Sequence, residues 1–199
     1  VWDDFYLYLA YEVTDSNLVA LGTGLDNGPP NNRRPQAIEY APKKQIDLVE
    51  FFIADNPRFF WELHHNAANH LNTLWIELPT AVQLKKIPKP GYSHIKFHRE
   101  RFLPDDGNHT VQRAVRLSPN ATLNQPADRD TGYTGELRLP WRSLFPSQPA
   151  PKPGRQFSLL AVSLNGNDGK AVYHSNGKNL PNLMYHYSAG RWPVFQLVK

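Results

Sequence analysis

The sequence predicts a mostly-β protein, a sandwich or barrel of about ten short strands. Short apolar runs and runs that alternate between apolar and polar residues recur along the 199-residue chain. No window keeps apolar residues at helical spacing for three turns. Turn-forming residues separate these runs, and the chain holds 18 Pro and 12 Gly. The length suits one domain spanning residues 1–199.

Each predicted strand combines β-branched or aromatic residues with turn signals at its ends. In chain order the predicted strands are residues 5–13, 46–54, 59–65, 71–78, 94–102, 110–117, 132–139, 156–164, 171–174 and 194–198. Proline removes a ladder donor, and Gly and Asn supply positive φ, so the segments rich in these residues are predicted loops. These loops are residues 25–35, 87–92, 103–108 and 145–154. One helical turn is predicted within residues 139–145, next to Pro140.

Composition excludes several classes of protein. The chain has no Cys, which excludes disulfides, a thiolate metal site and a cysteine nucleophile. Its apolar runs are far shorter than the roughly 20 residues that cross a bilayer, so we expect no membrane insertion. The net charge of +4 is scattered in ones and twos, so we expect no nucleic-acid partner. The sequence does not specify an oligomeric state.

Strand parity sorts the side chains of three successive runs into two faces, because side chains alternate along a strand. One face of each run is almost wholly apolar and is predicted to build the core. It holds Val49, Phe51 and Ile53, then Phe59, Trp61 and Leu63, then Leu74, Ile76 and Leu78. The second faces would bring together Glu50, Phe52, Phe60, Glu62, His64, Trp75 and Glu77.

Such a combination of rings and carboxylates suits a sugar ligand. Rings stack on the C–H faces of a pyranose, and carboxylates accept hydrogen bonds from neighbouring hydroxyls. Tyr187 and Trp192 are further candidates, because loops at the ends of a sandwich often carry binding sites. The alternative is a second apolar layer beneath the Pro-rich segment 79–92, with the acids paired to Lys or Arg.

The sequence patterns for metal binding are less specific than those for a sugar ligand. Zinc needs three or four converging ligands, but the adjacent His64 and His65 point to opposite faces of a strand, so no metal ligands are assigned. Calcium prefers oxygen ligands, which several loops offer without an EF-hand layout. These loops are residues 15–17, 25–28, 104–108 and 165–169.

Catalytic motifs are missing, and we assign no catalytic residues. The chain contains no G-x-S-x-G, H-E-x-x-H or G-x-x-x-x-G-K sequence. Two alternatives to a binding protein remain. Glu50 and Glu62 would serve a glycosidase if suitably spaced. Met184 with His174 or His186 would suit the haem of an electron-transfer domain.

Several stretches, in order along nearly the whole chain, resemble family-nine carbohydrate-binding modules. "VWDDFYLYLAYEVTDSNL" resembles their opening strand and turn, and "IDLVEFFIAD" is similar to their V-E-x-F-I-D strand. "FFWELHHNAANHLNTLWIEL" resembles their next two strands, although His64 and His65 replace the usual N-P. "GYTGELRLPWRSLF" matches their G-Y-T-x-E-x-x-I-P-W-x-x-L run, and "WPVFQLVK" resembles the closing strand.

The resemblance implies an antiparallel, immunoglobulin-like and jelly-roll-like β-sandwich. It implies a non-catalytic sugar-binding module of a carbohydrate-processing protein that is secreted, periplasmic or on the cell surface. Family members carry structural Ca²⁺, and the broader superfamily includes haem-binding cytochrome domains. The match assigns Trp141 to the core, as parity assigns Trp61. The chain starts at what resembles the second strand of these domains, so their first N-terminal strand would be missing.

Overall fold

The computed structural model describes residues 1–20, 47–80, 83, 85–86, 96–98, 111–166, 172–177 and 189–199. The strands in these ranges are β1 (Tyr6–Val13), β2 (Leu48–Ala54), β3 (Phe59–Asn66), β4 (Leu71–Glu77), β5 (Lys96–His98), β6 (Gln112–Leu117), β7 (Tyr133–Pro140), β8 (Gln156–Asn165), β9 (Val172–Ser175) and β10 (Val194–Gln196). The helical turn α3 (Trp141–Leu144) follows β7, and the 3-10 turn η5 (Ala189–Arg191) precedes β10. Within the described residues each predicted strand overlaps one of these, and α3 lies where a helical turn was predicted.

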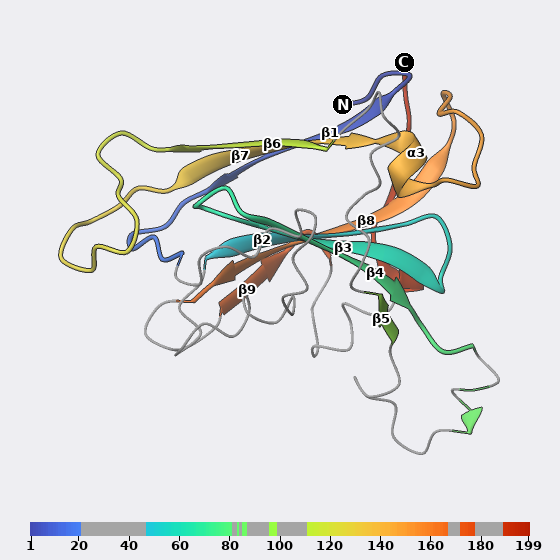
Figure 1. Cartoon of the computed structure of the whole chain (residues 1–199), viewed down its shortest axis with the longest axis horizontal. Helices are drawn as coiled ribbons and strands as arrows, with labels where there is room; N and C mark the ends of the chain where they lie inside the picture. The colour runs from blue at the N-terminus through green and yellow to red at the C-terminus, as the bar shows by residue number, and fades with distance from the viewer. Residues whose placement is uncertain are drawn as a thin grey trace.

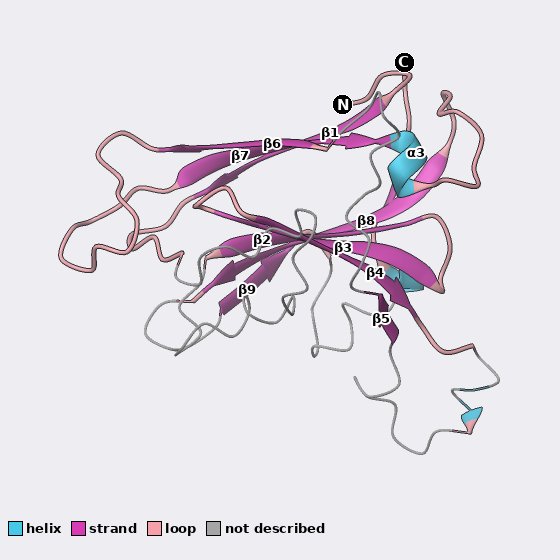
Figure 2. Cartoon of the chain, in the orientation of Figure 1, coloured by secondary structure: helices cyan, strands magenta, loops and turns pink. Residues whose placement is uncertain are grey.

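Two antiparallel sheets form the protein, which confirms the predicted all-β sandwich. The smaller sheet has the order β1-β7-β6 and lies above the larger one in Figure 1. The larger sheet has the order β10-β8-β2-β3-β4-β5, and β9 pairs with β8 along the same edge as β10. Figure 2 shows how little of the described chain is helical.

The main core fills the space between the sheets. Leu7, Leu137 and Leu139 of the small sheet pack in one cluster with residues of β2 and β3 in the large sheet. Those residues are Val49, Phe51, Ile53, Trp61 and Leu63. We call this side of the large sheet its inner face. The opposite side is the outer face, and alternation along the strands places Glu50, Phe52, Phe60, Glu62 and His64 there.

Both faces of the central strands are buried. β2 is buried along its whole length, and β3 along all but its first residue. In the small sheet, β7 instead alternates between buried and more exposed positions, β6 alternates between exposed and partly buried ones, and β1 is fully buried only at its first two residues. A strand that is covered on both sides reads as a continuous apolar run, as "LVEFFIA" does. The large sheet therefore has a second packed layer on its outer face.

Two tryptophans lock the end of the sandwich near α3. The indole nitrogen of Trp61 donates to the carbonyl of Leu144 at 3.0 Å, and that of Trp141 donates to the carbonyl of Asp3 at 3.0 Å. Each ring is 3% exposed, so the assignment of both to the core is confirmed. These bonds tie β3 and the segment before β1 to α3.

The chain ends lie close together at one end of the small sheet (Figure 1). The amide of Tyr8 donates to the carbonyl of Val1 at 2.9 Å, and Trp2 forms an isolated bridge with Leu7. The indole nitrogen of Trp2 donates to the carbonyl of Val198 at 2.8 Å. No helix within the described residues is both long and apolar enough to span a membrane.

Candidate functional site

Three predicted site residues form a polar cluster on the outer face. Glu50 lies on β2 directly opposite His64 of β3, and Glu62 precedes His64 by two residues on the same face. The Nε2 atom of His64 lies 2.8 Å from Oε1 of Glu62 and 3.9 Å from Oε1 of Glu50. The exposed fractions are 6% for Glu50, 3% for Glu62 and 0% for His64. Two carboxylates and one imidazole therefore share one interior site.

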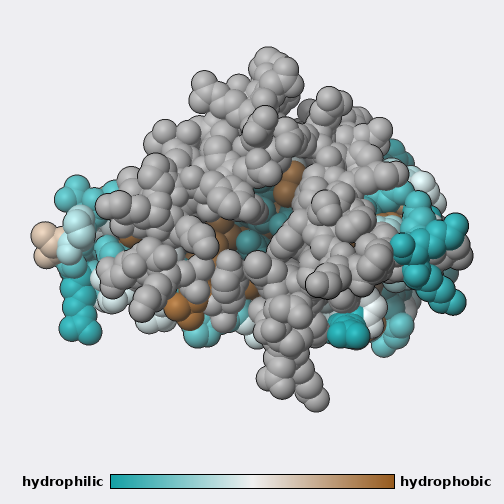
Figure 3. All heavy atoms as spheres, turned by 90° about the horizontal axis from the view of Figure 1, so that it is seen from below, coloured by the Kyte–Doolittle hydropathy of each residue, from teal (hydrophilic) through white to brown (hydrophobic). Residues whose placement is uncertain are grey.

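Three predicted aromatic residues lie next to this cluster. Phe52 and Phe60 project from β2 and β3, and Trp192, which follows η5, packs on both. The ring centroid of Trp192 lies 5.0 Å from that of Phe60 in an edge-to-face contact and 5.7 Å from that of Phe52. All three rings are buried, so they form an apolar floor beside the acids. Figure 3 views the molecule from this side and shows apolar and hydrophilic atoms next to each other near its centre.

Trp75 and Glu77 lie on the other side of the sheet, so the prediction that they share a face with Glu62 is wrong. Trp75 is directly opposite Trp61 across β3 and β4, with ring centroids 5.0 Å apart, and packs against the inner core. Glu77 is opposite Phe59 and accepts a 3.0 Å hydrogen bond from Nη2 of Arg58. Parity orders faces within one strand, but the register between strands decides which faces join.

The same register corrects the assignment of the alternate positions on β4. Leu74 lies opposite Glu62, and Ile76 lies opposite Phe60. Leu74 and Ile76 therefore belong to the aromatic layer on the outer face and not to the inner core. Sequence reasoning also missed Asn72, which is opposite His64 and completely buried. Asparagine is typical of turns, so an asparagine near a predicted loop was not considered as a site residue.

His65 confirms that the paired histidines face opposite sides. Its Nδ1 lies 2.9 Å from the hydroxyl of Tyr11, and its Nε2 lies 2.9 Å from Oδ1 of Asn69. Tyr11 belongs to the small sheet, so the contact with His65 joins the two sheets.

Tyr187 and the haem candidates Met184 and His186 lie outside the described residues, whereas His174 is exposed on β9.

Three buried aspartates occupy another part of the molecule, where two of the predicted calcium loops meet. Nδ2 of Asn165 donates to Asp15 at 2.6 Å. Asp47 accepts from the amides of Val19 at 2.5 Å and Gly166 at 2.9 Å. Burial raises the pKa of Asp47 to about 6, with the charges of Asp15 and Asp130 adding to the effect.

These aspartates offer the oxygen ligands that calcium prefers, but each oxygen already accepts a hydrogen bond. Asp130 accepts from the amides of Leu18 at 2.6 Å and Thr122 at 2.8 Å. Asp15 accepts a further 2.9 Å bond from the amide of Asn17. The chemistry of the donor set fits Ca²⁺. The same carboxylates hold the loops around Leu18, Thr122 and Gly166 together.

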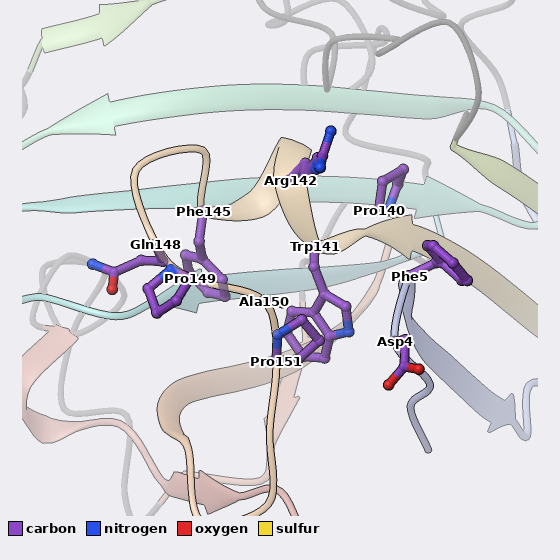
Figure 4. A pocket seen from close by; sticks show the side chains of 10 residues that line it. All are labelled: Asp4, Phe5, Pro140, Trp141, Arg142, Phe145, Gln148, Pro149, Ala150 and Pro151. Atoms are coloured by element: carbon purple, nitrogen blue, oxygen red, sulfur yellow. The ribbon is translucent and has the colours of Figure 1, made fainter.

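A cleft of about 640 Å³ lies beside α3, at the end of the small sheet that is away from the three aspartates. Its walls include Asp4, Phe5, Trp141, Phe145 and Pro151. Figure 4 shows the indole of Trp141 beside Pro151, with Phe5 and Asp4 across from them. Phe5 is 56% exposed, so it is the accessible ring of this cleft. No motif in the sequence predicted the cleft.

Comparison of the fold with solved structures gives matches that span nearly the whole chain. A crystal structure of a candidate carbohydrate-binding protein from Bacteroides uniformis aligns with a TM-score of 0.59 and 13% identity, covering 97% of this chain and 73% of that one. A family-nine carbohydrate-binding module from Caldicellulosiruptor kristjanssonii in complex with glucose aligns with a TM-score of 0.55 and 15% identity, covering 98% and 72%. The chain has the family-nine fold.

A further structure of a family-nine module from Caldicellulosiruptor kristjanssonii, in complex with cellotriose, has a TM-score of 0.53 and 15% identity and covers 99% of this chain and 71% of that one. No model of a known protein family matches the sequence, and no curated protein matches it. The family-nine fold is therefore recognisable from backbone arrangement and from short motifs, at an identity too low to carry over individual ligand contacts.

Proposed function

We propose that this domain binds carbohydrate as a non-catalytic module. The observation that carries the proposal is the match of almost the whole chain to family-nine modules whose structures hold glucose and cellotriose. The outer face supplies chemistry consistent with such a ligand, because it combines carboxylates with aromatic rings. Fold alone does not define function, so the site must be tested directly.

We place the ligand over the outer face at Glu50. Glu50 keeps the largest exposed fraction of the three polar residues, at 6%. A carboxylate there accepts hydrogen bonds from sugar hydroxyls, and such charge-assisted bonds are stronger than neutral ones. The buried hydrogen bond between Glu62 and His64 holds the neighbouring side chains in place. Trp192, packed on Phe52 and Phe60, gives the site its apolar side.

Isothermal titration with glucose, cellobiose and cellotriose tests this proposal. Wild-type protein is expected to bind at least one of them, and Glu50→Gln is expected to weaken binding more than about tenfold, because a charged hydrogen bond is worth about 1.5–3 kcal/mol. Binding of no sugar from this set or from a wider glycan array would overturn the proposal. Release of reducing sugar during the titration would instead indicate a glycosidase.

Two control variants locate the site. Trp75→Phe alters the inner face, and Phe5→Ala alters the exposed wall of the cleft beside α3. Both are expected to keep wild-type affinity. If Phe5→Ala abolishes binding and Glu50→Gln does not, the ligand occupies the cleft and the outer-face assignment is wrong.

We also propose that Ca²⁺ binds at Asp15, Asp47 and Asp130 and strengthens the loops that these residues connect. Its effect would be structural, because a ligand that binds only the folded state raises the melting temperature. With the protein first stripped of bound metal by EDTA and dialysed, millimolar Ca²⁺ is expected to raise the melting temperature of the wild type and to leave that of Asp47→Asn unchanged. Equal curves for wild-type protein in EDTA and in millimolar Ca²⁺ would contradict this assignment.

We infer that the protein works outside the cytoplasm, where polymeric glycans are met. The support is the carbohydrate-binding role proposed above. Fractionation of the native cells, followed by immunodetection, tests the inference, with the protein expected in the medium, periplasm or surface fraction. Detection only in the cytoplasmic fraction would contradict it.

A further inference from the structure

Four polar side chains from three neighbouring strands share the outer face. Glu50 of β2, His64 of β3 and Asn72 of β4 lie in one row across the sheet, since each is directly opposite the next. Glu62 adjoins this row on β3. The exposed fraction of these residues is between 0% and 6%, so the group lies inside the protein.

The positions of the ligand atoms match those of a small cation site. One carboxylate oxygen from each glutamate and one ring nitrogen of His64 all lie within 4.8 Å of one another. A tetrahedral zinc ion with bonds of about 2.0 Å sets its ligand atoms about 3.3 Å apart. The 2.8 Å and 3.9 Å separations from His64 Nε2 to the two glutamates lie on either side of that value.

Unpartnered polar atoms point independently to a ligand at this place. Oε2 of Glu62 is buried without a hydrogen-bond partner, and so are both amide atoms of Asn72. A buried polar group without a partner costs about 1–3 kcal/mol, and such groups are uncommon in folded proteins. A cation bound to Oδ1 of Asn72 and to the glutamates would use these atoms. It would also bring a positive charge to the two buried glutamate side chains.

We propose that Glu50, Glu62, His64 and Asn72 form a closed binding site for a divalent transition-metal ion, with Zn²⁺ the best match. An imidazole among carboxylates favours such an ion over Ca²⁺ or Mg²⁺, which prefer oxygen ligands alone. Four protein ligands leave no open position, so the role is structural. The ion would join β2, β3 and β4 beneath the proposed carbohydrate site.

The inference goes beyond carbohydrate binding and does not require it. Glu50 is common to the two proposals, whereas Glu62, His64 and Asn72 would bind only the metal ion. The metal test needs no sugar. Failure to bind zinc therefore leaves the carbohydrate proposal standing, and failure to bind sugar leaves the metal site standing.

The test uses the full chain without a histidine tag, stripped with EDTA and dialysed. Titration with ZnCl₂ is expected to give one ion per chain and to raise the melting temperature. Co²⁺ in place of zinc is expected to give the intense visible bands of a tetrahedral site. Glu62→Gln and His64→Gln are each expected to weaken zinc binding by more than about tenfold and to remove the cobalt bands.

His174→Gln is the matched control, because it removes an exposed histidine from β9 of the same sheet. It is expected to bind zinc as the wild type does. If His64→Gln fails to fold by circular dichroism, Asn72→Ala replaces it and is expected to weaken zinc binding. Wild-type protein that binds no zinc would overturn the proposal, and so would ligand variants that bind as tightly as the wild type.

Discussion

The imidazole of His64 and the carboxylate of Glu62 are joined at 2.8 Å in the interior of the protein, on one strand and two residues apart. Such i, i+2 neighbours share a face of the sheet, so the pair needs no turn or loop to bring it together. Its strength should exceed that of an exposed ion pair, because the surroundings exclude water.

A double-mutant cycle measures this interaction. In buffer with EDTA, urea unfolding of wild type, Glu62→Gln, His64→Leu and the double variant is expected to give a coupling energy of about 1–3 kcal/mol. The partly exposed pair of Arg58 and Glu77 serves as the comparison, with an expected coupling below about 1 kcal/mol. Equal coupling energies in the two pairs would contradict the expectation.

The pKa of Asp47 predicts a pH dependence of stability. Burial raises this pKa to about 6, above its value in the unfolded chain, so the folded protein binds the proton more tightly. The contribution of Asp47 to stability is fully present below about pH 4 and is lost as the pH rises through about 6. Between those values the wild type should lose about 2–3 kcal/mol relative to Asp47→Asn.

Urea unfolding at a series of pH values, with calcium-free protein in calcium-free buffer, checks this prediction. Asp47→Asn also loses one acceptor for a main-chain amide, which shifts its curve by a constant amount at every pH. Only the difference in slope between the two proteins reports on the titration. Parallel curves over the whole range would show that Asp47 does not titrate in this window.

The hydroxyl of Tyr133 is buried and has no hydrogen-bond partner. Removing such a group relieves its desolvation cost, so Tyr133→Phe is expected to stabilise the protein by about 1 kcal/mol. Tyr11→Phe is the matched control, because its hydroxyl contacts Nδ1 of His65, and it is expected to destabilise the protein by a similar amount. A lower melting temperature for Tyr133→Phe would contradict the prediction.

Gly135 of β7 lies directly beneath the ring of Tyr11, its partner across β1 and β7. An added Cβ would overlap the ring, which is held by Phe51, His65 and Tyr133. Gly135→Ala is therefore expected to destabilise the protein by about 1–3 kcal/mol in urea unfolding. Gly190→Ala, where the added Cβ meets nothing within 4 Å, should change stability little.

The sequence predicted the strands well and the site only partly. The alternation of β7 and the continuous apolar run of β2 are local properties that can be read directly from the sequence. Alternation also predicted that Glu50 and His64 share a face. Their strands follow one another in the sequence and pair directly, so the two residues lie side by side. Register does not follow from alternation, so Trp75 was placed on the wrong face. The aspartates at 15, 47 and 130 converge through loops far apart in sequence, which no spacing rule could reveal.

The contact between Trp61 and Trp75 gives the large sheet an optical signature. Two indoles at 5.0 Å, inclined by 59°, lie close enough for their electronic transitions to couple, which produces a pair of circular-dichroism bands of opposite sign. The bands depend on β3 and β4 being in this one alignment. A slip by a single residue would move one indole to the outer face and extinguish them. Spectroscopy on a dilute sample can therefore distinguish the native alignment from a shifted one as the chain folds.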